Sequence, residues 1–333
     1  MIVWLQFILC ALVIIVAGAN LSKYGDVIAE KSGLGRAWIG LILMASITSM
    51  PELITGVSSV ALVGSLDLAF GDIMGSCVFN LIILALMDPM NGKTPMFNAA
   101  GRGHVLSASF SVLLIGVAAI SISLAGIIPT VFHISMSTPV IFLIYVVGMR
   151  SLYKYEKTVI DEFVSGAAEK HKYKDIALRR AVALFAVNAA FVIVAAIFLP
   201  FIAENIAHVT GLGTTFVGSA FVAMTTSLPE VVISIAALRL GALDMAIANM
   251  FGSNMFNIMV LGVDDIFYTR GSVFAAVSGS HIVTAMIAVT MTSIAVIALI
   301  YRQTKNALLR FGWGTFTILI IGLLNFVVLY LIK

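Results

Sequence analysis

Charged residues are scarce in this sequence. Asp, Glu, Lys and Arg make up 11% of the 333 residues, whereas a soluble globular domain carries about 25%. Hydrophobic residues make up 61% of the chain, which excludes intrinsic disorder. The net charge of +3 is too small to indicate a nucleic-acid partner. A protein with so few charges and so much apolar sequence is expected to lie in a lipid bilayer.

Cysteine is almost absent. The two cysteines, Cys10 and Cys77, both lie within apolar runs, so a disulfide-stapled fold is excluded. Long apolar runs are abundant instead, and a run of about 20 such residues crosses a bilayer as a helix. We therefore predict an all-α polytopic membrane protein. Its ten spans are expected at residues 2–20, 36–63, 66–88, 104–124, 126–149, 179–203, 213–239, 242–264, 280–301 and 311–332.

The first run ends in Ala17-Gly18-Ala19, which resembles a signal-peptidase site. No Lys or Arg precedes it, whereas a signal peptide begins with a basic region. We expect a retained helix. Sidedness follows from the connections, because Lys and Arg accumulate on the cytoplasmic side. All of the 19 Lys and Arg residues except Arg270 and Lys333 fall on one side. This predicts a cell (inner or plasma) membrane protein with external termini and a cytoplasmic 150–180 loop.

The chain contains an internal repeat. Thr48-Ser49-Met50-Pro51-Glu52 recurs as Thr226-Ser227-Leu228-Pro229-Glu230, and a second block recurs 177 residues later, from Leu66-Asp67 to Asp88. With five spans in each unit, the second copy enters the membrane in the opposite orientation, which is the plan of many secondary transporters. We predict a first repeat at 1–150 (core 33–88), a loop at 151–178 and an inverted repeat at 179–333 (core 211–265).

Each repeat places one glutamate, Glu52 or Glu230, near the middle of a span. An ionisable group at the bilayer centre costs at least about 2.5–3.5 kcal/mol, and no Lys or Arg occupies the centre of any span. A bound cation is the simplest partner; the alternative is a pair of protonated glutamates that hydrogen-bond to backbone. Pro51 and Pro229 interrupt the helical hydrogen bonds and free carbonyl oxygens beside the glutamates. Neighbouring hydroxyls come from Thr48, Ser49, Thr226 and Ser227, and hard cations take such oxygen ligands.

The following span of each repeat carries a polar stripe. Asp72, Ser76 and Asn80 are four residues apart, as are Asn249, Ser253 and Asn257, so each set occupies one helix face. Gly75 and Gly252 would let these helices approach the glutamate-bearing ones closely. Taken alone, Ser and Asn in a membrane helix more often join helices than bind ions. Their duplication opposite the glutamates favours a ligand role. Asp88, Asp264 and Asp265 follow these stripes and are expected at the membrane interfaces.

These motifs resemble the calcium/cation antiporters, and among them the sodium/calcium exchangers. Members carry Thr-Ser-x-Pro-Glu on one helix and Gly-Asn-x-x-Gly-Ser-Asn-x-x-Asn/Asp on the next. Here the first motif is intact twice, and the second begins at Gly71 and at Ala248. Asp72, Cys77 and Ala248 depart from the pattern, and neither Asn80 nor Asn257 is the aspartate of some relatives.

The resemblance implies a central Ca²⁺ site at the two glutamates, with Na⁺ sites around them. The implied ligands are Ala45, Thr48, Ser49, Glu52, Ser76 and Asn80 with Ala223, Thr226, Ser227, Glu230, Ser253 and Asn257. Asp72 is either an extra carboxylate near the external access path or a structural residue that hydrogen-bonds to its neighbouring helix.

The expected function is secondary antiport of Ca²⁺ against Na⁺. One alternative keeps the fold but is proton-coupled or carries Mg²⁺, Mn²⁺ or K⁺; another is a channel. No hydrolase motif such as HExxH is present, so no enzyme is expected. No cofactor is expected either, since Ca²⁺ and Na⁺ would be cargo. The expected partners are the lipid bilayer and the transported cations, with no nucleic acid and no protein partner implied.

The charge asymmetry makes a prediction about topology. A cysteine introduced in the 150–180 loop should react with an impermeant thiol reagent only after the membrane has been opened, because the loop is predicted to be cytoplasmic. Labelling of that cysteine in intact cells would reverse the predicted orientation.

Overall fold

The computed structural model describes residues 2–31, 48–92, 94–163, 176–239, 241, 243–302 and 311–332. The longer helices are α1 (Ile2–Lys31), α4 (Met50–Ser58), α5 (Leu66–Met87), α7 (Gly103–Ser123), α8 (Ser137–Phe163), α9 (Leu178–Thr210), α12 (Leu228–Arg239), α13 (Leu243–Phe267), α15 (Ser280–Ile300) and α16 (Trp313–Leu331). Short helices are η2 (Ser59–Val63), η3 (Asp88–Asn91), α6 (Met96–Ala99), α10 (Thr214–Val217), η4 (Gly218–Val222), α11 (Ala223–Thr226) and α14 (Val273–Ala276).

Seven of these helices are long and apolar enough to cross a membrane: α1, α5 with η3, α7, α9, α13, α15 and α16. An eighth candidate is the bent pair Thr214–Thr226 and Leu228–Arg239, whose halves meet at 45°. The shorter apolar stretch Met50–Val63 lies within the expected span 36–63, of which residues 48–63 are described. The expectation of an all-helical, multi-pass membrane protein is thus confirmed, and the number of spans stays a prediction.

The expected span 126–149 is wrong in its first part. Residues 130–135 form a small antiparallel hairpin, β1 (Thr130–Val131) and β2 (Ile134–Ser135), with Thr130 paired to Ser135. Pro129 cannot continue a helical hydrogen-bond ladder, and Phe132 adopts a positive φ of 57° in the turn. Helix α8 then extends to Phe163, so the first part of the loop predicted at 151–178 is helical.

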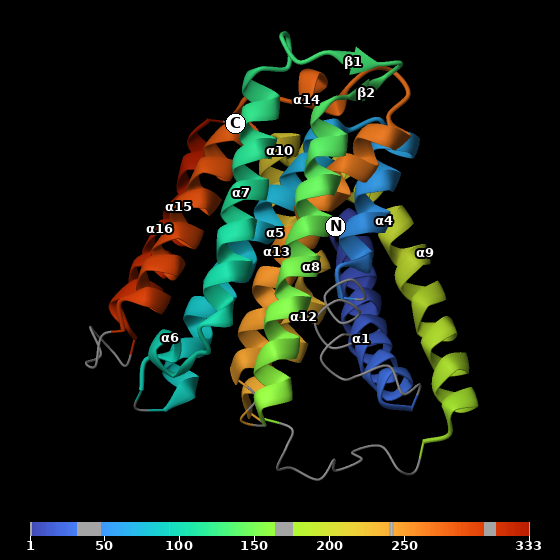
Figure 1. Cartoon of the computed structure of the whole chain (residues 1–333). Helices are drawn as coiled ribbons and strands as arrows, with labels where there is room; N and C mark the ends of the chain where they lie inside the picture. The colour runs from blue at the N-terminus through green and yellow to red at the C-terminus, as the bar shows by residue number, and fades with distance from the viewer. Residues whose placement is uncertain are drawn as a thin grey trace.

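Helices α5 and α13 form the centre of the bundle. The most apolar windows of these two helices are 89% and 83% buried, whereas those of the five other long candidates are at most 50% buried. Helices α7, α8, α15 and α16 pack around them on one side. On the other side α1 and α9 lie against each other (Figure 1). The hairpin and α14 lie at one end of the bundle, and α6 lies at the other (Figure 1).

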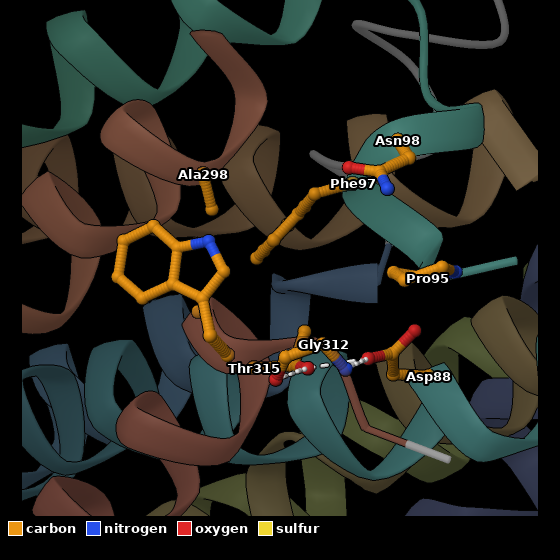
Figure 2. A pocket seen from close by; sticks show the side chains of 9 residues that line it. Asp88, Pro95, Phe97, Asn98, Ala298, Gly312 and Thr315 are labelled. Carbon is orange, nitrogen blue, oxygen red and sulfur yellow. Dashed lines mark hydrogen bonds between the residues drawn. The ribbon is translucent and has the colours of Figure 1, made fainter. Parts of the chain in front are cut away.

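Two buried aspartates at the ends of the central helices organise the adjacent loops. Asp88 accepts hydrogen bonds from the backbone N–H groups of Met96 and Gly312 and from the Thr315 hydroxyl, beside a small pocket (Figure 2). Asp265 plays the same part at the hairpin end. It accepts from the backbone N–H groups of Val273 and Ser135 and from the Thr138 hydroxyl. Both carboxylates are fully buried, so they anchor loops inside the protein.

A second pair of aspartates links the two halves of the chain. Asp67 accepts from the Ser278 backbone N–H and lies 3.0 Å from His281 Nε2. Asp244 accepts from the Gly101 backbone N–H and lies 2.9 Å from His104 Nε2. The partners in these contacts are related by the same 177-residue offset as the sequence repeat. The second half therefore repeats the tertiary contacts of the first as well as its motifs.

Candidate cation-binding site

The two glutamates lie directly after breaks in their helices. Ser49 and Ser227 have nearly the same non-helical backbone conformation, with φ/ψ of −88°/14° and −82°/2°. Pro51 and Pro229 follow these breaks and remove helical donors. The helices resume when Leu53 and Val231 donate to the carbonyls of Ser49 and Ser227. Each glutamate therefore sits in the first turn of a new helix segment, as the sequence predicts for an interrupted span.

Each glutamate is held by a serine from the other half of the chain. The Ser49 hydroxyl donates to Glu230 Oε1 over 2.9 Å, and the Ser227 hydroxyl lies 3.2 Å from Glu52 Oε1. Ser253 is a further neighbour of Glu230 Oε1, at 3.4 Å. Both glutamates are completely buried. The two copies of the motif therefore meet and form a single site.

A third carboxylate, Asp72, lies in the same region. The Thr226 hydroxyl donates to Asp72 Oδ1 over 2.8 Å, and Ser76 lies 2.9 Å from Ser227 through the two hydroxyl oxygens. Among the described residues no Lys, Arg or His forms an ion pair with any of these three carboxylates. The site thus concentrates negative charge.

Several oxygens in this region have no hydrogen-bond donor. Glu52 Oε2, Glu230 Oε2, Asp72 Oδ2 and Asn80 Oδ1 are buried and unpartnered among the described residues. Buried polar atoms are usually hydrogen-bonded, so these oxygens are available to a ligand. No cluster of three or more His, Cys, Asp or Glu side chains suited to a metal is present in the described part of the chain. A cation here would therefore need neutral hydroxyl and amide oxygens as well as carboxylates.

The predicted site residues divide into four groups. Those that contact one another across the two halves are Ser49, Glu52, Asp72, Ser76, Ala223, Thr226, Ser227 and Glu230; Ala223 takes part through its carbonyl. Ser253 contacts Glu230 within the second half. Thr48, Asn80 and Asn257 are buried next to this group. Ala45 lies outside the described residues.

Asn254 is a residue that the sequence reasoning missed. Its side chain accepts from the Asn80 amide over 2.9 Å and donates to the Cys77 carbonyl over 3.1 Å. Cys77 and Asn254 are equivalent positions of the repeat, so α5 and α13 contact each other at matching points. The available signal was this offset of 177 residues, which pairs Asn254 with a motif position that is cysteine in the first copy.

The close crossing of α5 depends on Gly75. A Cβ atom at this position would lie 2.5 Å from the Ser219 carbonyl oxygen and 2.6 Å from the Ser219 Cα atom. Ser219 belongs to η4, which precedes the Glu230 segment. Only glycine lets the polar stripe of α5 come this close to η4, the segment that leads to Glu230. The sequence predicts such a close approach.

The model of the family "Sodium/calcium exchanger protein" matches residues 2–152 and 180–333. The chain belongs to this family. Among the relatives of this family member, the sodium/calcium exchanger MaX1 of Methanosarcina acetivorans is 26% identical over 300 residues, which cover 78% of the present chain and 82% of MaX1. The inner membrane protein YrbG of Escherichia coli is 24% identical over 254 residues and 75% of each chain.

Solved structures of the sodium-calcium exchanger NCX_Mj resemble this family member over almost its whole length. The structure soaked with 10 mM Na⁺ and zero Ca²⁺ gives a TM-score of 0.63 at 19% identity and covers 98% of both chains. At this identity the likeness establishes a shared fold. The all-helical arrangement around α5 and α13 is thus the exchanger fold.

For this exchanger-family protein we predict that Gly75→Ala disrupts the site by forcing α5 away from η4. Overpacking of this kind costs typically about 1–3 kcal/mol, so the thermal unfolding temperature in detergent should fall. Gly116→Ala is the matched control, because a Cβ there meets nothing within 4 Å. Equal unfolding temperatures for the two variants would contradict the close crossing.

Proposed function

We propose that this protein is a secondary active antiporter that exchanges Ca²⁺ for Na⁺ at the buried site around Glu52 and Glu230. Family membership supports cation antiport as the class of activity. One observation carries the finer assignment: two glutamates from separate halves are joined by cross-half serines, and each keeps an unpartnered buried oxygen. A transporter in this family is not an enzyme, and the site holds cargo ions.

The donor set fits a hard cation. The described site offers carboxylate, hydroxyl, amide and carbonyl oxygens, and these are the ligands that Ca²⁺ takes in proteins. Among the described site residues the only thiol is that of Cys77. Na⁺ accepts the same neutral oxygens, so both ions can compete for one site. Competition for shared ligands is the simplest physical basis for exchange, because one ion must leave before the other binds.

Charge neutralisation links binding to transport. Two ionised glutamates in the middle of a bilayer are too costly to carry across unpaired. One divalent ion, or the competing monovalent ions, would cancel this charge and allow the loaded site to switch between the two faces. The unloaded and ionised site would resist this change. Coupled exchange then follows from electrostatics, and a continuously open channel is disfavoured.

An inverted repeat would supply the two access states. We propose ten membrane helices in two five-helix units, 1–150 and 179–333, as the sequence predicts. The contacts of Asp67, Asp88, Asp244 and Asp265 support this arrangement, because each pair repeats at an offset of 177 residues. Two structurally similar halves around one midplane site are the architecture of alternating access. In the proposed orientation the hairpin end faces outward.

A second candidate keeps this mechanism and changes the ions. Asn80 and Asn257 occupy positions where some relatives carry an aspartate, and Asp72 adds a carboxylate elsewhere. Because the carboxylates are distributed differently, the coupling ion can differ too. The second candidate is therefore a proton-coupled exchanger, or one that carries Mg²⁺, Mn²⁺ or K⁺.

We predict that Glu52→Gln and Glu230→Gln each reduce Ca²⁺ exchange in proteoliposomes to background. Each change removes a charge that binds the ion while keeping the side-chain shape, so folding and insertion should be retained. Glu204→Gln, on α9 and outside the site, is the control and should exchange normally. Near-normal exchange by both site variants would remove the basis of the proposed central site.

We also predict that Asp72→Asn preserves exchange but weakens cation affinity from the hairpin side and flattens the dependence of that affinity on external pH. The variant keeps a group that can accept from Thr226 and removes the third carboxylate. Uptake rates should be measured against cation concentration at several external pH values. An unchanged affinity and pH profile would make Asp72 a structural residue.

A further inference from the structure

Asp264 is a buried carboxylate that the central site does not use. It lies on α13, has no exposed surface, and both of its carboxylate oxygens lack a hydrogen-bond partner among the described residues. Its neighbour Asp265 uses its own oxygens to anchor the hairpin and α14. Protonation would remove the charge of Asp264 but leave an O–H donor without an acceptor. Neither form is satisfied by the described surroundings.

The carboxylate packs directly against the backbone of a glycine. A Cβ atom at Gly56 would lie 2.8 Å from both Oδ1 and Oδ2 of Asp264. Gly56 is on α4, four residues after Glu52, so it lies about one turn, or about 6 Å, farther along the helix. Ser59 follows three residues later in η2, and its buried hydroxyl oxygen also lacks a partner among the described residues. Unpartnered oxygens therefore occur both on α13 and just beyond the end of α4.

Asp264 lies on the path from the central site to the hairpin end. It is seven residues after Asn257, which keeps it on the same stripe of α13 and about 10 Å farther along. Carboxyl groups thus extend from Glu52 towards the end of the bundle that carries β1 and β2 (Figure 1).

The sequence repeat does not account for this aspartate. The position equivalent to Asp264 in the first half is Met87, a buried apolar residue. Two-fold packing of the halves therefore requires no charge here. The described Lys, Arg and His residues form no ion pair with Asp264, so no basic side chain offsets its burial.

We propose that Asp264 is the main ligand of a second cation site between α4 and α13, on the hairpin side of the central site. A hard cation, Ca²⁺ or Na⁺, binds both of its oxygens beside Gly56 and passes from there to the glutamates. The inference rests on the proposed cation transport and adds a separate station to it. A cation satisfies both carboxylate oxygens at once and offsets their buried negative charge.

Equilibrium binding of radioactive Ca²⁺ to the purified full-length protein in detergent tests this proposal. The wild-type protein should show a tight and a weak class of sites. Asp264→Asn, which keeps the side-chain shape, should lose the weak class and keep the tight one. Gly56→Ala should do the same without changing any charge, because its methyl group would collide with both carboxylate oxygens and displace them. Gly116→Ala is the matched control and should retain both classes.

Glu52→Gln separates the two proposals. It should lose the tight class and keep the weak one. Tight binding that survives this change would contradict the central site and leave the second site unaffected. Survival of both classes in Asp264→Asn and Gly56→Ala, or a single class in the wild-type protein, overturns the second site. Gel filtration of each variant establishes that it is folded, and the two independent variants keep the test valid if one of them fails to fold.

Discussion

The buried negative charge around Glu52, Glu230 and Asp72 constrains the rest of this protein. Three carboxyl groups lie in one region without exposure to water, and no described basic side chain pairs with them. An uncompensated charge in the bilayer is too costly to persist. The site is stable only when protons or cations balance it. The need for a mobile counter-charge is what links this fold to ion transport.

The surrounding helices hold these carboxylates in place without neutralising them. The breaks at Ser49 and Ser227 place each glutamate in the first turn of a new helix segment, and the two serines hydrogen-bond to the glutamates across the halves. Gly75 removes the side chain that would separate α5 from η4. A hydrogen bond from a hydroxyl orients a carboxylate but does not neutralise its charge. The second oxygen of each glutamate has no partner among the described residues and stays open to a ligand. A salt bridge in the same place would have closed the site.

Sequence reasoning succeeded where one local pattern determines the outcome. Hydropathy predicts a membrane-embedded helical bundle. The doubled Thr-Ser-x-Pro-Glu motif predicts that its two copies come together, and the Ser49–Glu230 and Ser227–Glu52 contacts confirm this. That the two glutamates bind one ion stays a prediction. It failed where apolar composition hides a turn, since residues 126–149 read as one span although Pro129 starts a hairpin. The roles of Asp88 and Asp265 could not be predicted, because their partners come from distant segments such as Gly312 and Ser135. The contacts of Asn254 and the surroundings of Asp264 depend on which helices cross each other. Helical spacing in the sequence alone does not determine which helices cross.

We propose that one buried site couples Ca²⁺ movement to a Na⁺ gradient. This is tested by Ca²⁺ uptake into proteoliposomes that contain the wild-type protein, are loaded with Na⁺ and are diluted into Na⁺-free buffer, with H⁺ and K⁺ gradients tested in parallel. We expect uptake that requires the outward Na⁺ gradient and stops when an ionophore dissipates it. Uptake that proceeds equally without any Na⁺ gradient would exclude Ca²⁺/Na⁺ exchange.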